Sequence, residues 1–262
     1  NDTKPIVAVS VVPQESFVKA VAGNLVDTVV MIPPGYSPAN YAPSPQEMQK
    51  LSKASLYFSI GVPTETANIM PGLKDINKKV KVVDLPAKVA SVYPDREFAP
   101  GERDPHIWMS PKRVQVMVKV IARELSAIDP ANEKIYQENA DKYISQLANL
   151  DQELNTTLKD LPVKTFIIYH PAMGYFADDY GLKMVAIEEE GKEATVTSIQ
   201  NIIDTARQEN IKVVFYQASI ASKQADAIAE EIGGRTEQVD PLAPDYINNM
   251  KKVVQVFASV LQ

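Results

Sequence analysis

The stretch that decides the fold is PANEKIYQENADKYISQLANLDQELNTTLK, which occupies residues 130–159. After Pro130 it contains neither glycine nor proline, and apolar side chains recur in it at roughly helical spacing among many Glu, Lys, Gln and Asn residues. Those apolar side chains are Ile135, Tyr143, Leu147, Leu150, Leu154 and Leu158. We expect one helix of about 30 residues, which spans roughly 45 Å at a rise of about 1.5 Å per residue. Such a helix is long enough to cross more than one lobe of a protein.

Short β-rich runs alternate with helical patterns on both sides of this stretch. Before it, we expect strands at 6–12, 28–32, 56–60 and 80–85, and helices at 15–22, at 46–53 and after Thr64. After it, we expect strands at 164–169, 184–187 and 213–216, helices at 198–209, 223–231 and 245–259, and a last short strand after Gly233 and Gly234. This alternation favours mostly parallel sheets that are covered by helices on both faces.

The expected fold class is therefore α/β, with two α/β lobes whose mostly parallel sheets are joined by one long backbone helix. The expected boundaries are 1–128 for the amino-terminal lobe, 129–160 for the connecting helix and 161–262 for the carboxy-terminal lobe. Between residues 87 and 105 the chain is rich in proline and charge, so we expect a loop there. Pro111 then fits the first turn of a buried helix.

Composition excludes several classes of protein. The chain has 262 residues, of which 45% are hydrophobic, and this is ample for a buried core. With 27 basic and 33 acidic residues its formal net charge is -6, so we expect no nucleic-acid partner. No apolar run approaches the roughly 18 residues that a membrane span needs. Cysteine is absent, which excludes disulfides, thiolate metal sites and cysteine nucleophiles.

Two histidines and one aspartate stand out, because each lies beside a proline at the end of an expected strand or loop. His106 lies in the run DPHIW, His170 in YHP and Asp240 in VDPL. Ligands of α/β sheets bind at strand ends, and two imidazoles with one carboxylate suit Zn²⁺ or Mn²⁺. Taken singly, each histidine is more often a surface or capping residue, and the aspartate a turn residue. Because the three lie far apart in sequence, they form a site only if the two lobes face each other across a cleft.

Other kinds of site have weaker support. Ser219 and Ser222 do not follow a glycine-rich nucleophile elbow, and no phosphate-binding loop is present. The acidic run at 188–190 fits a solvated turn, although Glu190 or Glu193 could reach a cleft if that loop folds over it.

Several motifs in order resemble one known family. They are PG followed by SP at 34–38, DPHIWMSP at 104–111, HPAMGYF at 170–176 and DPL at 240–242. In this respect the chain is similar to the substrate-binding proteins of ABC importers for zinc, manganese and iron, the zinc-uptake or TroA-like class. The resemblance runs nearly from end to end. It implies two α/β lobes joined by a long backbone helix, with the metal between the lobes.

Three of the four usual metal ligands of that family carry over to this chain. The resemblance implies that His106, His170 and Asp240 bind the ion. The family's first ligand, a histidine in a Pro-Gly-x-x-Pro-His loop, does not carry over, because Ala39 occupies its position. A methyl group has no electron pair to donate to a metal.

Several replacements for this first ligand stay open. One alternative is that a water molecule, Asn40, Tyr41 or Glu190 takes the place of the missing donor. Another is that the shell stays incomplete and the affinity for the metal is reduced. A third is that the protein binds a different ligand. Asp104 and Gln217 are, with Tyr169, candidates to orient the imidazoles from outside that shell.

The function that the resemblance implies is that of an extracytoplasmic receptor rather than an enzyme. We expect it to capture zinc, or else manganese, as a transported ligand and to deliver the ion to the membrane permease of an ABC importer. We expect a monomer in the periplasm or at the cell surface, lipid-anchored or free. Imidazole titrates near pH 6.5 and must be deprotonated to bind, so acid should promote release of the metal.

Two alternatives belong to other classes. Three protein ligands with an open position describe a catalytic zinc site, in which a metal-dependent hydrolase would also need a general base and a substrate pocket. An adhesin-like protein whose metal site has decayed would explain Ala39. The presence of both histidines and Asp240 argues against that decay.

Replacing Ala39→His tests whether the loop at 34–41 faces the ion. We expect tighter zinc binding, because the variant regains the imidazole that the family usually has at this position. Competition with a fluorescent zinc chelator measures the change. An affinity equal to that of the unaltered chain would mean that this loop lies away from the metal.

Overall fold

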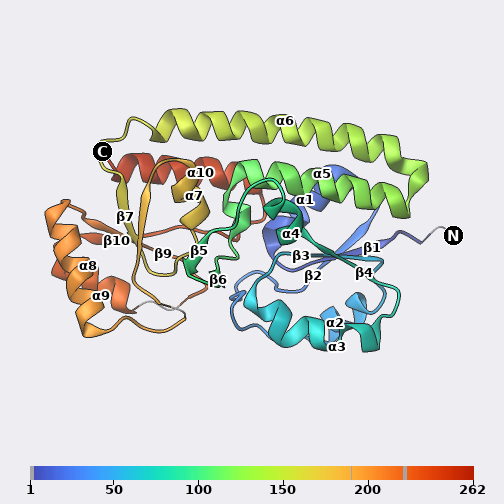
Figure 1. The fold of residues 1–262 in the computed structure, drawn as a ribbon, viewed down its shortest axis with the longest axis horizontal. Helices are drawn as coiled ribbons and strands as arrows, with labels where there is room; N and C mark the ends of the chain where they lie inside the picture. Colours follow the sequence, from blue (N-terminus) through green and yellow to red (C-terminus); the bar gives the residue numbers. More distant parts are fainter. Residues whose placement is uncertain (1–2, 190, 221–222) are drawn as a thin grey trace. The chain divides into compact units, whose positions relative to one another are not determined.

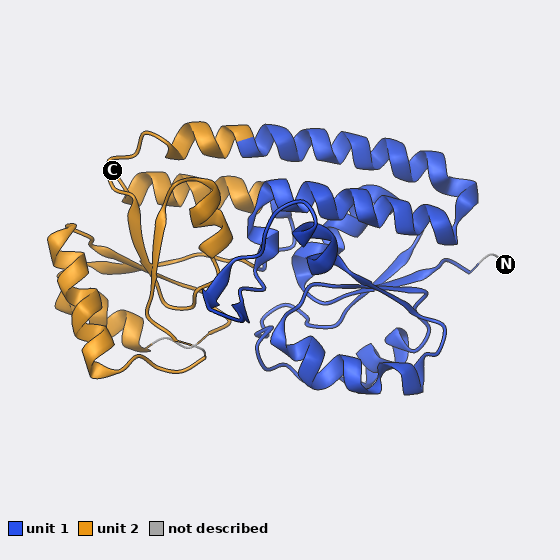
Figure 2. Ribbon diagram, in the orientation of Figure 1, with its two compact units in different colours: residues 1–151, 242–246 blue, residues 152–241, 247–262 orange. Residues whose placement is uncertain are grey.

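The structure is a computed structural model, and it describes residues 3–189, 191–220 and 223–262. The chain forms two compact units, which Figure 2 colours separately. Unit 1 comprises Asn1–Asp151 and Leu242–Tyr246, and unit 2 comprises Gln152–Pro241 and Ile247–Gln262. Each unit holds one sheet of four strands with helices packed against it (Figure 1).

The sheet of unit 1 is parallel throughout, in the order β2-β1-β3-β4. Its strands are β1 (Ile6–Val9), β2 (Asp27–Val30), β3 (Leu56–Ser59) and β4 (Lys81–Asp84). Helices α2 (Pro45–Leu51) and α3 (Met70–Ile76) cover one face, while α1 (Val12–Ala22), α4 (Leu85–Ala90) and α5 (Pro111–Ile128) lie on the other (Figure 1). Three short helical segments complete this part of the chain: a π-helix at Glu65–Ile69 and 3-10 helices at Ile107–Met109 and Pro130–Asn132.

The carboxyl ends of β1 and β3 meet at a buried carboxylate. Glu65 is 4% exposed, its Oε2 accepts from the Ile60 amide at 2.8 Å, and its Oε1 accepts from the Gly61 amide at 2.9 Å. The Ser10 hydroxyl also donates to it. Burial raises the pKa of Glu65, although these hydrogen bonds oppose the shift. At the point of this sheet where the strand order reverses, the hydrogen bonds of the Glu65 carboxylate are therefore supplied by other groups of the protein.

The sheet of unit 2 is also parallel throughout and has the order β10-β9-β7-β8. Its strands are β7 (Thr165–Ile168), β8 (Lys183–Ala186), β9 (Val213–Tyr216) and β10 (Arg235–Gln238). Helices α8 (Val196–Gln208) and α9 (Lys223–Glu231) cover one face, and α7 (Gly174–Asp179) and α10 (Tyr246–Val260) cover the other (Figure 1).

Alternate residues of the central strands pack against the helices on the two faces of this sheet. Ile167 and Val214 belong to an aliphatic core with residues of α8 and α9. Phe166 and Phe215 face the other way, where the Phe257 ring of α10 lies 4.8 Å and 4.5 Å from their ring centroids. Burial on both faces explains why these strands are continuous apolar runs, as expected of a covered parallel sheet. The predicted α/β class with mostly parallel sheets is confirmed.

The long helix α6 spans Glu133–Leu158, 26 residues, and is preceded by the 3-10 turn at Pro130–Asn132. At about 1.5 Å per residue it is roughly 39 Å long. It contributes residues to both units, because the boundary between them falls after Asp151 (Figure 2). The single long helix is thereby confirmed, whereas the three-part division at 1–128, 129–160 and 161–262 stays a prediction.

The apolar residues at helical spacing on this helix are not all buried. Ile135 is 43% exposed, whereas its neighbour Tyr136 is fully buried. The Tyr136 hydroxyl donates to Asp129 Oδ2 at 2.5 Å, so the polar end of a buried ring is satisfied at the helix start.

The loop expected between residues 87 and 105 is wrong in part. Helix α4 extends to Ala90, and an antiparallel hairpin follows, formed by β5 (Glu97–Ala99) and β6 (Glu102–Arg103). Asp84 accepts from the Ala87 amide at 3.1 Å and so starts α4. These elements are too short to show a hydrophobic period.

Among the described residues, every helix is too short or too polar to span a lipid bilayer.

Replacing Gly234→Ala should destabilise unit 2. A Cβ at this position would lie 1.9 Å from the Lys212 carbonyl oxygen, a backbone atom that cannot move aside. We expect a loss of about 1–3 kcal/mol in the free energy of unfolding, measured by urea denaturation. The matched control is Gly72→Ala in α3, where a Cβ would meet nothing within 4 Å and helix propensity favours alanine. Equal unfolding curves for the two variants would contradict this account.

Candidate metal centre

The imidazole of His106 is held by a carboxylate two residues before it. Asp104 Oδ1 lies 2.7 Å from His106 Nδ1 and also accepts from the His106 amide at 3.0 Å. Asp104 is completely buried, and Arg96 donates to its Oδ2 at 3.1 Å. Burial by itself raises the pKa of Asp104, but the hydrogen bonds from His106 and the nearby Arg96 charge outweigh it, so that this pKa is lowered. Asp104 is therefore a fixed negative charge beside the ring.

Aromatic rings surround the same imidazole. The His106 ring centroid lies 5.3 Å from that of the buried Trp108 and 6.5 Å from that of Phe98 on strand β5. His106 itself is 8% exposed. These two ring contacts and the hydrogen bond at Nδ1 together restrict the orientation of the imidazole.

The second histidine is held in the same way by a residue from a neighbouring strand. His170 follows β7, and its Nδ1 lies 3.1 Å from Glu188 Oε1. Glu188 follows β8, which pairs with β7 in parallel so that Ile168 stands opposite Ala186. Counting two residues on from that pair places His170 opposite Glu188. The sheet register thus brings the two side chains together.

Both contacts select the same tautomer. An ionised carboxylate accepts hydrogen bonds and donates none, so Nδ1 carries the proton in each ring. In the neutral imidazole the lone pair is then on Nε2. A histidine that donates its other ring N–H to a carboxylate is the usual arrangement of metal-binding histidines.

Asp240 lies two residues beyond β10, at the same carboxyl edge of the unit 2 sheet as His170. It is exposed, and its carbonyl oxygen accepts from the Asn249 side chain at 2.7 Å. Within the part of the chain that the structure describes, no three His, Asp or Glu side chains group closely enough to hold a metal ion. His106 belongs to unit 1, while His170 and Asp240 belong to unit 2. Their joint binding of one ion stays a prediction.

The loop that contains Ala39 offers few donors. Ala39 and Asn40 are exposed. The Tyr41 hydroxyl donates to Glu47 Oε1 at 2.5 Å, and this hydrogen bond, with burial and the Glu47 charge, raises the pKa of Tyr41 to about 12. A phenolate ligand is therefore harder to form at Tyr41. Glu190, the other protein candidate, lies outside the described residues.

Sequence reasoning missed Glu188. The run at 188–190 was expected to be a solvated turn, but Glu188 is 8% exposed and contacts His170. The signal that identifies it is its place after an expected strand, combined with the adjacency of β7 and β8. Asp104, by contrast, was correctly expected to orient an imidazole.

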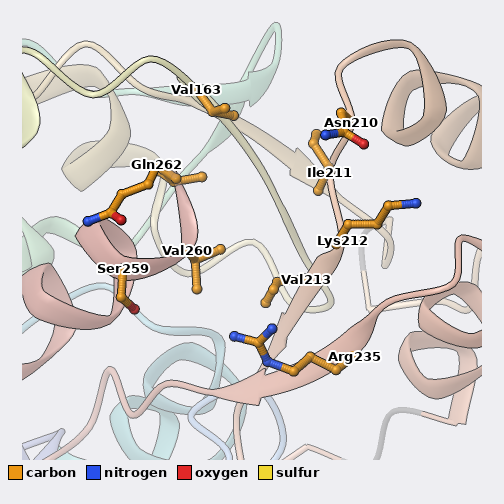
Figure 3. A pocket seen from close by; sticks show the side chains of 10 residues that line it. Val163, Asn210, Ile211, Lys212, Val213, Arg235, Ser259, Val260 and Gln262 are labelled. Carbon is orange, nitrogen blue, oxygen red and sulfur yellow. The ribbon is translucent and has the colours of Figure 1, made fainter.

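A pocket of about 240 Å³ in unit 2 lies away from these residues (Figure 3). Lys212, Val213 and Arg235 line it at the beginnings of β9 and β10, together with the last residues of α10. Because the sheet is parallel, this is the opposite edge from the carboxyl end of β7, which His170 follows. The pocket is therefore no part of the histidine site.

Known proteins resemble this chain over most of its length. A family profile described as zinc-uptake complex component A, periplasmic, matches residues 7–260. The high-affinity zinc uptake system protein ZnuA of Bacillus subtilis (strain 168) is 30% identical over 242 residues, covering 88% of this chain and 76% of that protein. The manganese ABC transporter substrate-binding lipoprotein PsaA of Streptococcus mitis is 27% identical over 224 residues, covering 81% of this chain and 72% of that protein. A crystal structure of ZnuA matches with a TM-score of 0.93 at 36% identity and covers 99% of this chain and 100% of that one. These matches confirm the resemblance drawn from the sequence motifs.

The two carboxylates should set the tautomers of the imidazoles even without metal. We expect ¹⁵N NMR of the metal-free protein to show the proton on Nδ1 in both rings. Asp104→Asn should weaken that preference in His106 alone, and Glu188→Gln in His170 alone, because an amide can either donate or accept. Each variant is thus the control for the other. Protons on Nε2 in both rings of the unaltered protein would contradict the assignment.

Proposed function

Because the chain belongs to the zinc-uptake component A family, we propose that it captures a divalent transition metal outside the cytoplasm and delivers it to an ABC importer. Zinc is the preferred ion and manganese the alternative. Among the relatives, ZnuA of Bacillus subtilis is named for zinc uptake and PsaA of Streptococcus mitis for manganese transport. The ion is cargo that the protein binds and releases.

One observation carries the proposal. The only two histidines of the chain each have Nδ1 against a buried carboxylate, at 2.7 Å in one case and 3.1 Å in the other. A metal ligand needs an electron pair on one ring nitrogen, and metal-binding histidines almost always donate the N–H of the other nitrogen to a carboxylate, a backbone carbonyl or water. Two such arrangements in a chain with two histidines support metal binding by both.

In the proposed site, His106 and His170 bind through Nε2 and Asp240 through a carboxylate oxygen. Two nitrogens with oxygen donors suit the tetrahedral shell that zinc prefers. The same donors also bind manganese, which accepts more oxygen ligands. The family's first histidine has no counterpart at Ala39, so the shell needs one donor from elsewhere.

The partner that follows from this function is the membrane permease of an ABC importer. We place the protein in the periplasm or at the cell surface, where a receptor meets the metal before import. PsaA of Streptococcus mitis is named as a lipoprotein, so a lipid anchor is one form that this placement takes. The receptor acts as a monomer, and a polyanion such as nucleic acid is no partner for a chain of net charge -6.

Capture is favoured over hydrolysis, the main alternative. The relatives carry the names of uptake and substrate-binding proteins. A hydrolase also needs a general base and room for a substrate beside the metal, which a receptor that binds only the ion does not. The adhesin-like alternative with a decayed site has no support in the ordered contacts of His106 and His170.

Isothermal titration of chelator-treated protein tests the proposal. We expect one Zn²⁺ or Mn²⁺ per chain near neutral pH, with affinity that falls as the pH is lowered, because protons compete for the imidazole nitrogens. His106→Ala, His170→Ala and Asp240→Asn should each weaken binding. Asp226→Asn, on the exposed side of α9, is the matched control and should bind as the unaltered chain does.

The loss of metal affinity in acid should occur while the protein is still folded. The pKa of Asp104 is lower in the folded protein than the usual value of about 3.9. The contribution of Asp104 to the free energy of unfolding is therefore fully present above that usual value, and it is lost only when the pH falls through the lower pKa of the folded state. Circular dichroism at each pH checks this.

In the isothermal titration, absence of heat with both metals at micromolar protein would contradict the receptor function.

A further inference from the structure

Gln217 is a buried polar side chain whose carboxamide is only half satisfied. The residue is 5% exposed, and its Nε2 donates to the Ser219 hydroxyl at 3.0 Å. Its Oε1 is buried and has no hydrogen-bond partner within the described ranges 3–189, 191–220 and 223–262. Buried carbonyl groups nearly always have a partner, so an atom of this kind points to a group that binds there.

The strand register places Gln217 in one row with the histidine site. Ile168 of β7 stands opposite Phe215 of β9, so His170 falls opposite Gln217. The same count on the other side of β7 puts His170 opposite Glu188, where the hydrogen bond between them is present. Residues at matching positions of parallel strands project to the same face. Glu188, His170 and Gln217 are therefore consecutive members of one row.

Sheet topology marks the middle of this row as a binding position. The chain runs from β7 to β8 on one side and then returns to β9 on the other side of β7. The strand order thus reverses between β7 and β9, and ligands of open α/β sheets bind outside the carboxyl ends of the strands at such a point. His170 and Gln217 are the residues that flank it.

The corresponding point of unit 1 shows what a closed arrangement looks like. There the strand order reverses between β1 and β3, and Glu65 accepts hydrogen bonds from groups at both strand ends. In unit 2, Gln217 has a neutral acceptor at this point that the described protein groups leave unused. A cation satisfies such an oxygen.

We propose that Gln217 Oε1 is an oxygen ligand of the ion bound by His170 and Asp240. This rests on the proposed function and deepens it. Tyr216 stands opposite Gln238, so Asp240 lies one residue beyond the position opposite Gln217 on the adjacent strand β10. The carboxamide supplies the donor that the methyl group of Ala39 lacks. It also shapes selectivity, because carbonyl oxygen suits Mn²⁺ better than Zn²⁺, for which imidazole and thiolate are the preferred donors.

Three variants test the ligand role by competition titrations with Zn²⁺ and Mn²⁺. Gln217→Leu keeps the volume but removes the oxygen, and it should weaken Mn²⁺ binding at least about tenfold and Zn²⁺ binding less. Gln217→Glu keeps an oxygen at the same place and should bind both ions at least as tightly as the unaltered chain. Gln208→Leu, at the exposed end of α8, is the matched control and should change neither affinity.

The outcomes separate this proposal from the function on which it rests. If Gln217→Leu binds both ions normally while His170→Ala loses them, the ligand role is wrong and the receptor function stands. If Gln217→Leu weakens both ions equally and Gln217→Glu does not restore them, the residue has only a structural role and the proposal is overturned. If the unaltered chain binds neither ion, the receptor function itself fails. Should Gln217→Leu not fold, as judged by circular dichroism, weaker binding of both ions by Gln217→Glu would also overturn the proposal.

Discussion

A hydrogen bond from imidazole Nδ1 to a buried carboxylate is the constraint on which the candidate site depends. It fixes the ring, fixes the tautomer and directs the electron pair to Nε2. The two units achieve it by different local means. In unit 1, Asp104 reaches His106 across a proline within one loop. In unit 2, Glu188 reaches His170 from the segment that follows the neighbouring strand β8. The two units thus reach the same contact between an imidazole and a carboxylate through different backbone arrangements.

The two parallel sheets share one topology but use it differently. In both, the strand order reverses beside the first strand of the unit, and the carboxyl ends at that point are the natural place for a ligand. Unit 1 satisfies this place internally through Glu65, a carboxylate whose pKa is raised by burial. Its histidine instead lies in the loop after β6. In unit 2, His170 and Gln217 follow the two strands that flank the corresponding place. A common topology thus surrounds a satisfied carboxylate in unit 1 and, in our proposal, a binding position in unit 2.

Patterns along the chain predict the scaffold well and the site in part. Strand β9 and helix α9 begin and end where the apolar pattern places them, because each has flanking residues that interrupt its period. The family motifs identify His106 and His170. Glu188 escapes such reasoning because an acidic run looks solvated, and only the pairing of β8 with β7 brings it to the imidazole. Likewise Tyr136, rather than Ile135, is buried on α6, because its hydroxyl reaches Asp129.

The central claim is that both imidazoles bind one ion through Nε2, together with Asp240. An anomalous-scattering map of metal-loaded crystals, recorded at the zinc and manganese edges, tests it most directly. The account predicts a single peak per chain, with Nε2 of His106 and of His170 about 2.0–2.1 Å from zinc and an Asp240 oxygen about 2.0–2.2 Å away. A peak bound by only one of the histidines, or one bound through Nδ1, would contradict it.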